Sequence, residues 1–353
     1  MDDSDRSRCP YVVGNTLELR LKTPKWGPRM EVRIMRTFHP FTWSSTMVVQ
    51  PTRPTAELKG DMVLKVFDRR YAAGHRENER MISCTPDFTP SCHLSVMDGE
   101  AGEPITELSL REHLLGPGKE TSSSSSEELN FDESMDNLYK TEVEAYNTLA
   151  DLQGHCIPRL LSCVTVPVSA PALTHDPVPR EYADVPGMLL QYIKGFRLDN
   201  LPLSAPKITW QTICEDAIRT IHRIGDRGVL NQDVKPRNFM VQTDFNGQYH
   251  VFMIDFGCCE FIREVRTRAE WQRKKASYDE EGAIGFVMEQ QLPGGFVYRR
   301  SDRYTKLRGK YMMEGLTSAW SLVPQVESHS MRAKRKVWKN SKMSLGTRLS
   351  DSS

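Results

Sequence analysis

Residues 233–257 read DVKPRNFMVQTDFNGQYHVFMIDFG, and two polar motifs stand at the ends of this stretch. The first is Asp233-Val234-Lys235-Pro236-Arg237-Asn238, and the second is Asp255-Phe256-Gly257. The residues between them, FMVQT at 239–243 and HVFMID at 250–255, predict two short strands, and the DFNG sequence at 244–247 suits a tight hairpin turn. The pattern therefore predicts a loop, a hairpin and a second loop that follow one another directly.

The residue types in these loops match the needs of phosphoryl transfer to a hydroxyl group. That reaction needs a carboxylate near the acceptor oxygen, a cation near the transferred phosphate and oxygen ligands for magnesium. Asp233 would orient or deprotonate the acceptor, Lys235 would neutralise charge on the phosphoryl group, and Asn238 would hold a metal ion. Asp255, at a strand end beside a glycine, would hold magnesium bridging the phosphates. Each motif alone is weak, but their order favours a functional site over coincidental loop residues.

Length and composition indicate a globular protein. The 353 residues are 39% hydrophobic and 26% charged, which is ample for a large core and two or three structural units. Lys and Arg number 47 against 46 Asp and Glu, so the whole-chain charge gives no reason to expect binding to nucleic acid or membranes. No stretch approaches the roughly 18 apolar residues of a membrane span, and the N-terminus lacks the apolar segment of a secretory signal.

The eight cysteines are scattered, with no CxxC pair. This spacing fits neither a disulfide framework nor a zinc site, so reduced thiols are the favoured interpretation. Together with the absence of a signal sequence, it predicts an intracellular protein, cytoplasmic or nuclear.

The two motifs resemble those of the protein kinase-like superfamily, in the divergent style of fungal-type protein kinase domain proteins. In protein kinases the catalytic loop reads HRDxxxxN; here Asn231-Gln232-Asp233 is followed by Asn238. The D-V-K-P-x-N pattern is closer to Ser/Thr protein kinases than to small-molecule kinases. The resemblance implies an α+β, two-lobed fold with an antiparallel N-lobe sheet and a reduced helical C-lobe, which uses ATP and Mg²⁺ to phosphorylate a protein hydroxyl.

The resemblance extends upstream in the expected order. Lys65, in VLKVFD, matches the strand lysine that holds the α- and β-phosphates. A lysine inside an apolar strand is costly unless it is paired, and the alternative is an edge-strand lysine that points to solvent. Its implied partner is Glu142, which precedes Tyr146 and Leu149 at the spacing of the family's helix glutamate; Glu144 is the second candidate.

The sequence GMLLQYIKG at 187–195 resembles the strand that leads into the hinge of a kinase. Leu190 would then lie at the back of the adenine site, and backbone groups from Gln191 to Ile193 would bond the base. An ordinary core strand explains the same side chains equally well.

Four departures from the family pattern leave the activity open. The tip of the first predicted hairpin, TFHPFT at 37–42, has no GxGxxG motif. Asn231 replaces the catalytic-loop histidine, although it can still form hydrogen bonds, and Gln232 replaces the arginine that clamps a phosphorylated activation loop. No APE motif follows Gly257. The alternatives are therefore a pseudokinase that acts as a binding or scaffold module, and a small-molecule kinase.

Hydrophobic periodicity and breaker residues predict the remaining organisation. We expect a mostly irregular N-terminal extension at 1–29, a kinase-like N-lobe and hinge at 30–198, a reduced C-lobe at 199–290, and a basic, largely disordered tail at 291–353. Within the N-lobe, a polar insertion at about 69–136 is expected to be disordered. The predicted elements are a hairpin at 31–50, strands at 62–68, 157–168 and 187–198, helices near 137–153 and 208–226, and a helix-prone region to about 290.

The protein substrate or partner is not indicated by any motif. The basic segment at 331–348 is the one part of the chain that would contact nucleic acid, an anionic membrane or an import receptor. A solvated, disordered tail is the favoured interpretation of it.

Overall fold

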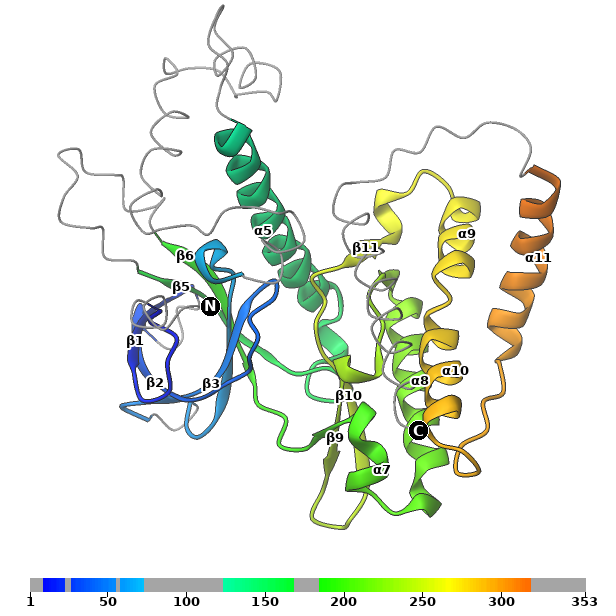
Figure 1. Cartoon of the computed structure of the whole chain (residues 1–353), viewed down its shortest axis with the longest axis horizontal. Helices are drawn as coiled ribbons and strands as arrows, with labels where there is room; N and C mark the ends of the chain where they lie inside the picture. The colour runs from blue at the N-terminus through cyan, green and yellow to red at the C-terminus, as the bar shows by residue number, and fades with distance from the viewer. Residues whose placement is uncertain (1–8, 23–26, 55–57, 73–122, 168–183, 319–353) are drawn as a thin grey trace, which may run out of the picture.

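The structure, a computed structural model, describes residues 9–22, 27–54, 58–72, 123–167 and 184–318 (Figure 1). A sheet made by strands from the segment up to Gln191 lies on one side, and most of the helices lie on the other. The expectation of mixed sheet and helix, with an antiparallel N-terminal sheet, is confirmed; that this sheet closes into a barrel was not predicted. The barrel strands, in the order in which they pair, are β1 (Thr16–Leu21), β2 (Arg29–Thr37), β3 (Ser45–Pro51), β4 (Met62–Val66), β6 (Val185–Gln191) and β5 (Leu160–Val166).

Strand β4 occupies a central position in the barrel, paired with β3 on one side and β6 on the other. Successive side chains of a strand point to opposite faces, so Met62, Leu64 and Val66 are buried inside the barrel while Lys65 lies on its outer face. The alternative of an edge-strand lysine is therefore wrong. Lys65 stands opposite Thr46 on β3 and Met188 on β6.

The N-terminal extension, expected to be mostly irregular over 1–29, contains a strand that was not predicted, β1 at Thr16–Leu21. Here apolar residues alternate with polar ones, and Leu17, Leu19 and Leu21 point inward. This period of two is the signal of a half-buried strand, while the prolines that suggested a loop lie outside the strand. Because β1 pairs with both β2 and β5, it closes the barrel.

Helix α5 (Ser123–Thr148) lies beside the barrel and begins well before the predicted start at 137. Its buried side chains, among them Tyr139, Ala145 and Tyr146, recur at helical spacings. The insertion predicted at 69–136 therefore ends in helix. Its central part, 73–122, lies outside the described residues.

The other half of the structure is mainly helical. The 17-residue helix α8 contacts β10 and α10, and it buries Ile213, Ala217 and Ile221 as predicted. The hairpin predicted between the two motifs is confirmed, with Thr243 opposite Tyr249. The helices of this half are α7 (Leu201–Ser204), α8 (Trp210–Asp226), α9 (Arg268–Tyr278), α10 (Glu280–Gln291) and α11 (Asp302–Ser318).

Short strands connect these helices, in two small antiparallel sheets. They are β7 (Phe196–Arg197), β8 (Val229–Asn231), β9 (Phe239–Thr243), β10 (Tyr249–Met253) and β11 (Cys259–Phe261). Short 3-10 turns occur at η2 (Arg69–Tyr71), η4 (Ala150–Leu152), η5 (Leu198–Asn200), η6 (Lys207–Thr209), η7 (Pro236–Asn238) and η8 (Ile262–Glu264).

The expectation of disorder from 291 onward is wrong for Asp302–Ser318, which form α11. This helix packs against α9, and its Tyr304 and Tyr311 are buried. Residues seven apart lie on the same face of a helix, so two aromatic side chains suffice to anchor this otherwise polar segment. The basic segment at 331–348 lies outside the described residues.

Within the described ranges, no helix combines the length and apolarity needed to cross a membrane. The six cysteines among the described residues form no disulfide bonds.

Leu19→Ala tests whether β1 is part of the core. The Leu19 side chain is fully buried in the barrel, so its truncation should lower the free energy of unfolding by about 2–5 kcal/mol. Leu203→Ala is the control, because Leu203 is 90% exposed and its change should stay within about 0.5 kcal/mol. Urea denaturation followed by circular dichroism measures both, and equal midpoints for the two variants would contradict the closed barrel.

Candidate active site

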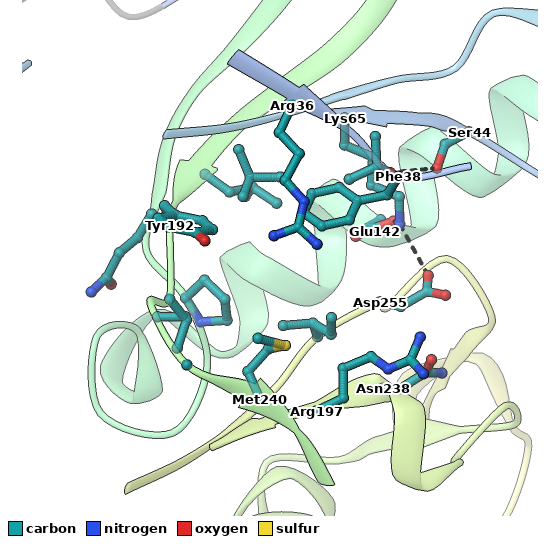
Figure 2. A pocket seen from close by; sticks show the side chains of 18 of the residues that line it. Arg36, Phe38, Ser44, Lys65, Glu142, Tyr192, Arg197, Asn238, Met240 and Asp255 are labelled. Atoms are coloured by element: carbon teal, nitrogen blue, oxygen red, sulfur yellow. Dashed lines mark hydrogen bonds and ion pairs between the residues drawn. The ribbon is translucent and has the colours of Figure 1, made fainter. Parts of the chain in front are cut away.

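A cleft of about 670 Å³ lies between the barrel and the motifs of residues 233–257 (Figure 2). This volume is within the usual range for small-molecule and cofactor sites. Its apolar lining includes Val63 on β4, Leu190 on β6, and Met240 and Ile254 from the β9–β10 hairpin region. The predicted site residues that line it are Lys65, Glu142, Leu190, Gln191, Ile193, Asn238 and Asp255.

Lys65 joins the two halves of the cleft. Its Nζ lies 2.5 Å from Glu142 Oε2 on α5 and 3.0 Å from Asp255 Oδ1 after β10. The Glu142 side chain is 1% exposed and that of Lys65 is 11% exposed, whereas the Asp255 side chain is 48% exposed. Burial acts to lower the pKa of Lys65, but the carboxylates of Asp255 and Glu142 outweigh it and raise this pKa. Lys65 is therefore a cation at neutral pH.

Glu144, the second candidate partner of Lys65, faces elsewhere. Its Oε1 accepts a hydrogen bond from Arg263 Nη2 at 2.7 Å, and its side chain is 42% exposed. Glu142 and Glu144 are two residues apart, so they lie on different faces of the helix. Of these two glutamates, Glu142 is the one that faces the barrel.

The backbone around Asp255 turns sharply. Asp255 has φ 69°, in the left-handed region that Asp adopts more readily than most residues. The turn sends Phe256 into the core, where its ring meets that of Tyr146 edge-on at 5.4 Å between centroids. Phe256 thus packs against α5, one turn from Glu142, while Asp255 points toward the cleft (Figure 2).

Asn231 links the two motifs. Its Nδ2 donates to the carbonyl oxygen of Asp255 at 2.9 Å, and its Oδ1 accepts from the backbone N–H of Asp233 at 2.8 Å. A carboxamide carries both a donor and an acceptor, so one side chain can bond both loops. Asn231 therefore connects the two motifs through a single side chain.

Asp233 and Lys235 are not among the residues that line the cleft, but they belong to the loop that ends in Asn238. Lys235 Nζ lies 2.5 Å from Asp233 Oδ1. Asn238 Nδ2 donates to the carbonyl oxygen of Asp233 at 2.9 Å, which fixes the shape of the loop. The side chains of Asp233 and Lys235 are both partly exposed.

Sequence reasoning missed Glu280, at the start of α10. This buried carboxylate accepts from the backbone N–H of Asn231 at 2.9 Å, and it also bonds Lys275 Nζ at 2.6 Å and the Tyr304 hydroxyl at 3.1 Å. It anchors the loop of Asp233 to the helices beneath it. The sequence holds no signal for this role, because the glutamate lies far along the chain in a charged, helix-prone region.

One hydrogen bond reduces the set of backbone groups at 191–193 that could bond an adenine base. Leu190 and Ile193 are buried at the edge of the cleft, as expected for its apolar wall. The backbone N–H of Gln191, however, donates to the carbonyl oxygen of Arg159 at 2.9 Å. That donor is already used within the protein and cannot bond a base.

Three further cleft residues were also missed: Arg36, Phe38 and Arg197. Arg36 and Phe38 are two residues apart on an extended segment, so they share a face (Figure 2). The alternation of side chains along a strand could have placed Arg36 and Phe38 beside the cleft, once their hairpin had been aligned with the strand that carries Lys65. Arg197 lies across the cleft from them, near Asn238 (Figure 2).

The residues present fit magnesium held together with a phosphate ligand. Among the described residues, no cluster of three or more His, Cys, Asp or Glu could hold a metal alone. Magnesium commonly binds one or two protein oxygens and completes its shell with phosphates and water. Asp255 and Asn238 both line the cleft, and the amide nitrogen of Asn238 is engaged by Asp233, so its Oδ1 is the atom that a cation would contact.

No family model matches this chain. Among solved structures, one similar chain is the ROP18 kinase domain in complex with AMP-PNP and sucrose, with 13% sequence identity and a TM-score of 0.40. The similarity covers 74% of the present chain and 62% of that chain. At this identity and TM-score, the functional assignment depends on the geometry of the present site.

Glu142→Gln and Glu144→Gln separate the buried pair from the surface pair. Glu142→Gln leaves a buried lysine with one half-exposed carboxylate, and breaking such a pair should cost about 3–5 kcal/mol of unfolding free energy. Glu144→Gln removes an exposed pair and should cost less than about 1 kcal/mol. Chemical denaturation measures both values. A larger loss for Glu144→Gln would contradict the assignment of the Lys65 partner.

Proposed function

We propose that this chain is a protein kinase-like phosphotransferase that uses ATP and Mg²⁺ to phosphorylate a protein hydroxyl. The observation that carries the proposal is the Lys65 cluster, in which a central-strand lysine contacts both Glu142 and Asp255 at the edge of a cleft of nucleotide size. When all three groups are ionised, the cluster has one more negative than positive charge. An excess carboxylate that is half-exposed to the cleft favours a bound divalent cation.

The cleft provides separate surroundings for a base and for phosphates. Val63, Leu190 and Met240 supply apolar walls suited to the faces of an aromatic base. Lys65 and Asn238, at the other end, supply a cation and a polar amide. Magnesium bound there would neutralise phosphate charge as it develops in the transition state.

Asp233 is the proposed group that orients the acceptor hydroxyl and takes up its proton. It is connected to Asp255 through Asn231, so its position relative to the cleft is fixed by two hydrogen bonds. Lys235, paired with Asp233, is the proposed cation for the transferred phosphoryl group. The choice of a protein Ser or Thr as acceptor rests on the D-V-K-P-x-N sequence.

Asp233→Asn is the test of transfer. Loss of the proposed base should lower the rate of phosphoryl transfer by about 100- to 10,000-fold while ATP binding is kept. Radiolabel transfer from ATP to a panel of generic proteins, and to the chain itself, measures it. The matched control is Asp226→Asn, because Asp226 is half-exposed and pairs with Arg303 away from the cleft. Equal transfer by wild type and Asp233→Asn would refute the enzymatic proposal.

A second candidate function is a nucleotide-binding module without turnover. The loop between β2 and β3, FHPFTWS at 38–44, contains no glycine, and Phe38 lies over the cleft. A backbone that carries side chains cannot approach phosphates as closely as glycine allows. This feature favours weak or slow phosphate chemistry.

Thermal stability with millimolar ATP and Mg²⁺ tests whether the site takes a nucleotide. A ligand at 100 times its dissociation constant stabilises the folded state by about 2.7 kcal/mol, and the melting temperature should rise accordingly. Lys65→Arg should lose most of this rise, measured against its own ligand-free state, whereas Lys306→Ala on the exposed face of α11 should keep it. Stabilisation by ATP without radiolabel transfer would favour the binding module, and no stabilisation would refute both functions.

A further inference from the structure

Arg36 points into the cleft from the end of β2. Its guanidinium carbon lies 4.8 Å from the centre of the Phe38 ring, a cation–π contact, and both residues line the cleft. Figure 2 shows the two side chains together over the open space, opposite Asp255, Asn238 and Arg197. The arginine is exposed, and the aromatic ring restricts where its charged end can lie.

The strand register places this charged end near the phosphate end of the cleft. Arg36 stands opposite Val48, and Val48 opposite Val63, so its backbone is level with the apolar wall. The backbone N–H of Phe38 donates to Thr46 at 3.1 Å, and Thr46 stands opposite Lys65. Phe38 is therefore level with Lys65. By stacking on Phe38, the long side chain of Arg36 extends from the level of the wall toward that of Lys65.

Lys65 and Arg197, the other cations that line the cleft, both contact carboxylates, and Arg36 differs from them in this respect. Lys65 contacts two carboxylates, and Arg197 forms two hydrogen bonds of 3.0 Å to Asp199. For Arg36, no carboxylate partner is found among the residues that the structure describes, and its recorded contact is the Phe38 ring. Its positive charge is therefore available to an anionic ligand.

We propose that Arg36 binds the phosphates of the nucleotide and takes the place of the backbone N–H groups that a glycine-rich loop would supply. The inference rests on the proposed nucleotide site and names a further binding residue in it. The glycine-free loop keeps its backbone away from the ligand, and an arginine bridges this distance with a planar group that bonds phosphate oxygens in pairs. The Phe38 ring holds the guanidinium in place before binding, which reduces the entropy lost on binding.

Calorimetric titration with two ligands tests this inference. ATP with Mg²⁺ reports the whole nucleotide, and adenosine reports the part without phosphates. Arg36→Ala should weaken ATP binding by about 10- to 100-fold, as expected for lost hydrogen bonds to a charged group, and leave adenosine binding within about twofold of wild type. Arg36→Lys should recover part of the ATP affinity because it restores the charge but not the paired donors.

Arg33→Ala is the matched control. Arg33 lies on the same strand and is exposed, but it does not line the cleft, so both affinities should remain those of wild type. Wild-type affinities for both ATP and adenosine in Arg36→Ala would overturn the inference while the nucleotide site stands. Equal losses for both ligands would also overturn it, because they would show a general effect on the cleft. A wild-type chain that binds neither ligand would overturn the proposed function itself.

Discussion

The pairing of Lys65 with Glu142 and Asp255 constrains the arrangement of the whole molecule. A lysine on a central strand cannot reach solvent easily, and an unpaired buried charge costs several kcal/mol. The barrel supplies the lysine, α5 supplies one carboxylate, and the turn after β10 supplies the other. These three elements must meet for the charge to be satisfied. The cleft is therefore shaped by the same contacts that hold its two sides together.

A second set of contacts fixes the loops on the helical side. Asn231 holds both motifs through one carboxamide, and Glu280 holds the backbone of Asn231 from below. The chain beyond the second motif is tied in as well, because Gln232 bonds Glu260, which also pairs with Lys274. These contacts form between unmodified side chains, so they do not require phosphorylation of the chain. The uncharged side chain of Gln232 thus bonds the carboxylate of Glu260, and this contact holds the first loop to the segment after the second motif.

The sequence predicted those parts of the structure whose residues are close along the chain or follow a strict period. The hairpin between the motifs, helix α8 and the two loops were of this kind, and Glu142 followed from its spacing to Tyr146. Strand β1 was missed because nearby prolines outweighed a short alternating pattern, and α11 because two tyrosines anchor a polar helix. Arg36 and Glu280 depend on tertiary register. The positions of Arg36 beside the cleft and of Glu280 under the backbone of Asn231 depend on segments that are far apart in the sequence.

Positive and negative side chains lie at different places in the cleft, and their separation affects which charged ligands can bind there. When both of its carboxylates are ionised, the Lys65 cluster carries an excess negative charge beside Asn238. Arg36 on the opposite wall carries a positive charge without a carboxylate partner among the described residues. A simple anion would be repelled by Asp255, and a simple cation by Arg36. A polyphosphate with a bound divalent cation satisfies both, since its metal can face Asp255 while its oxygens face Arg36. A glycine-free hairpin is compatible with such a ligand, because in the proposed site a side chain rather than the backbone would make the phosphate contact.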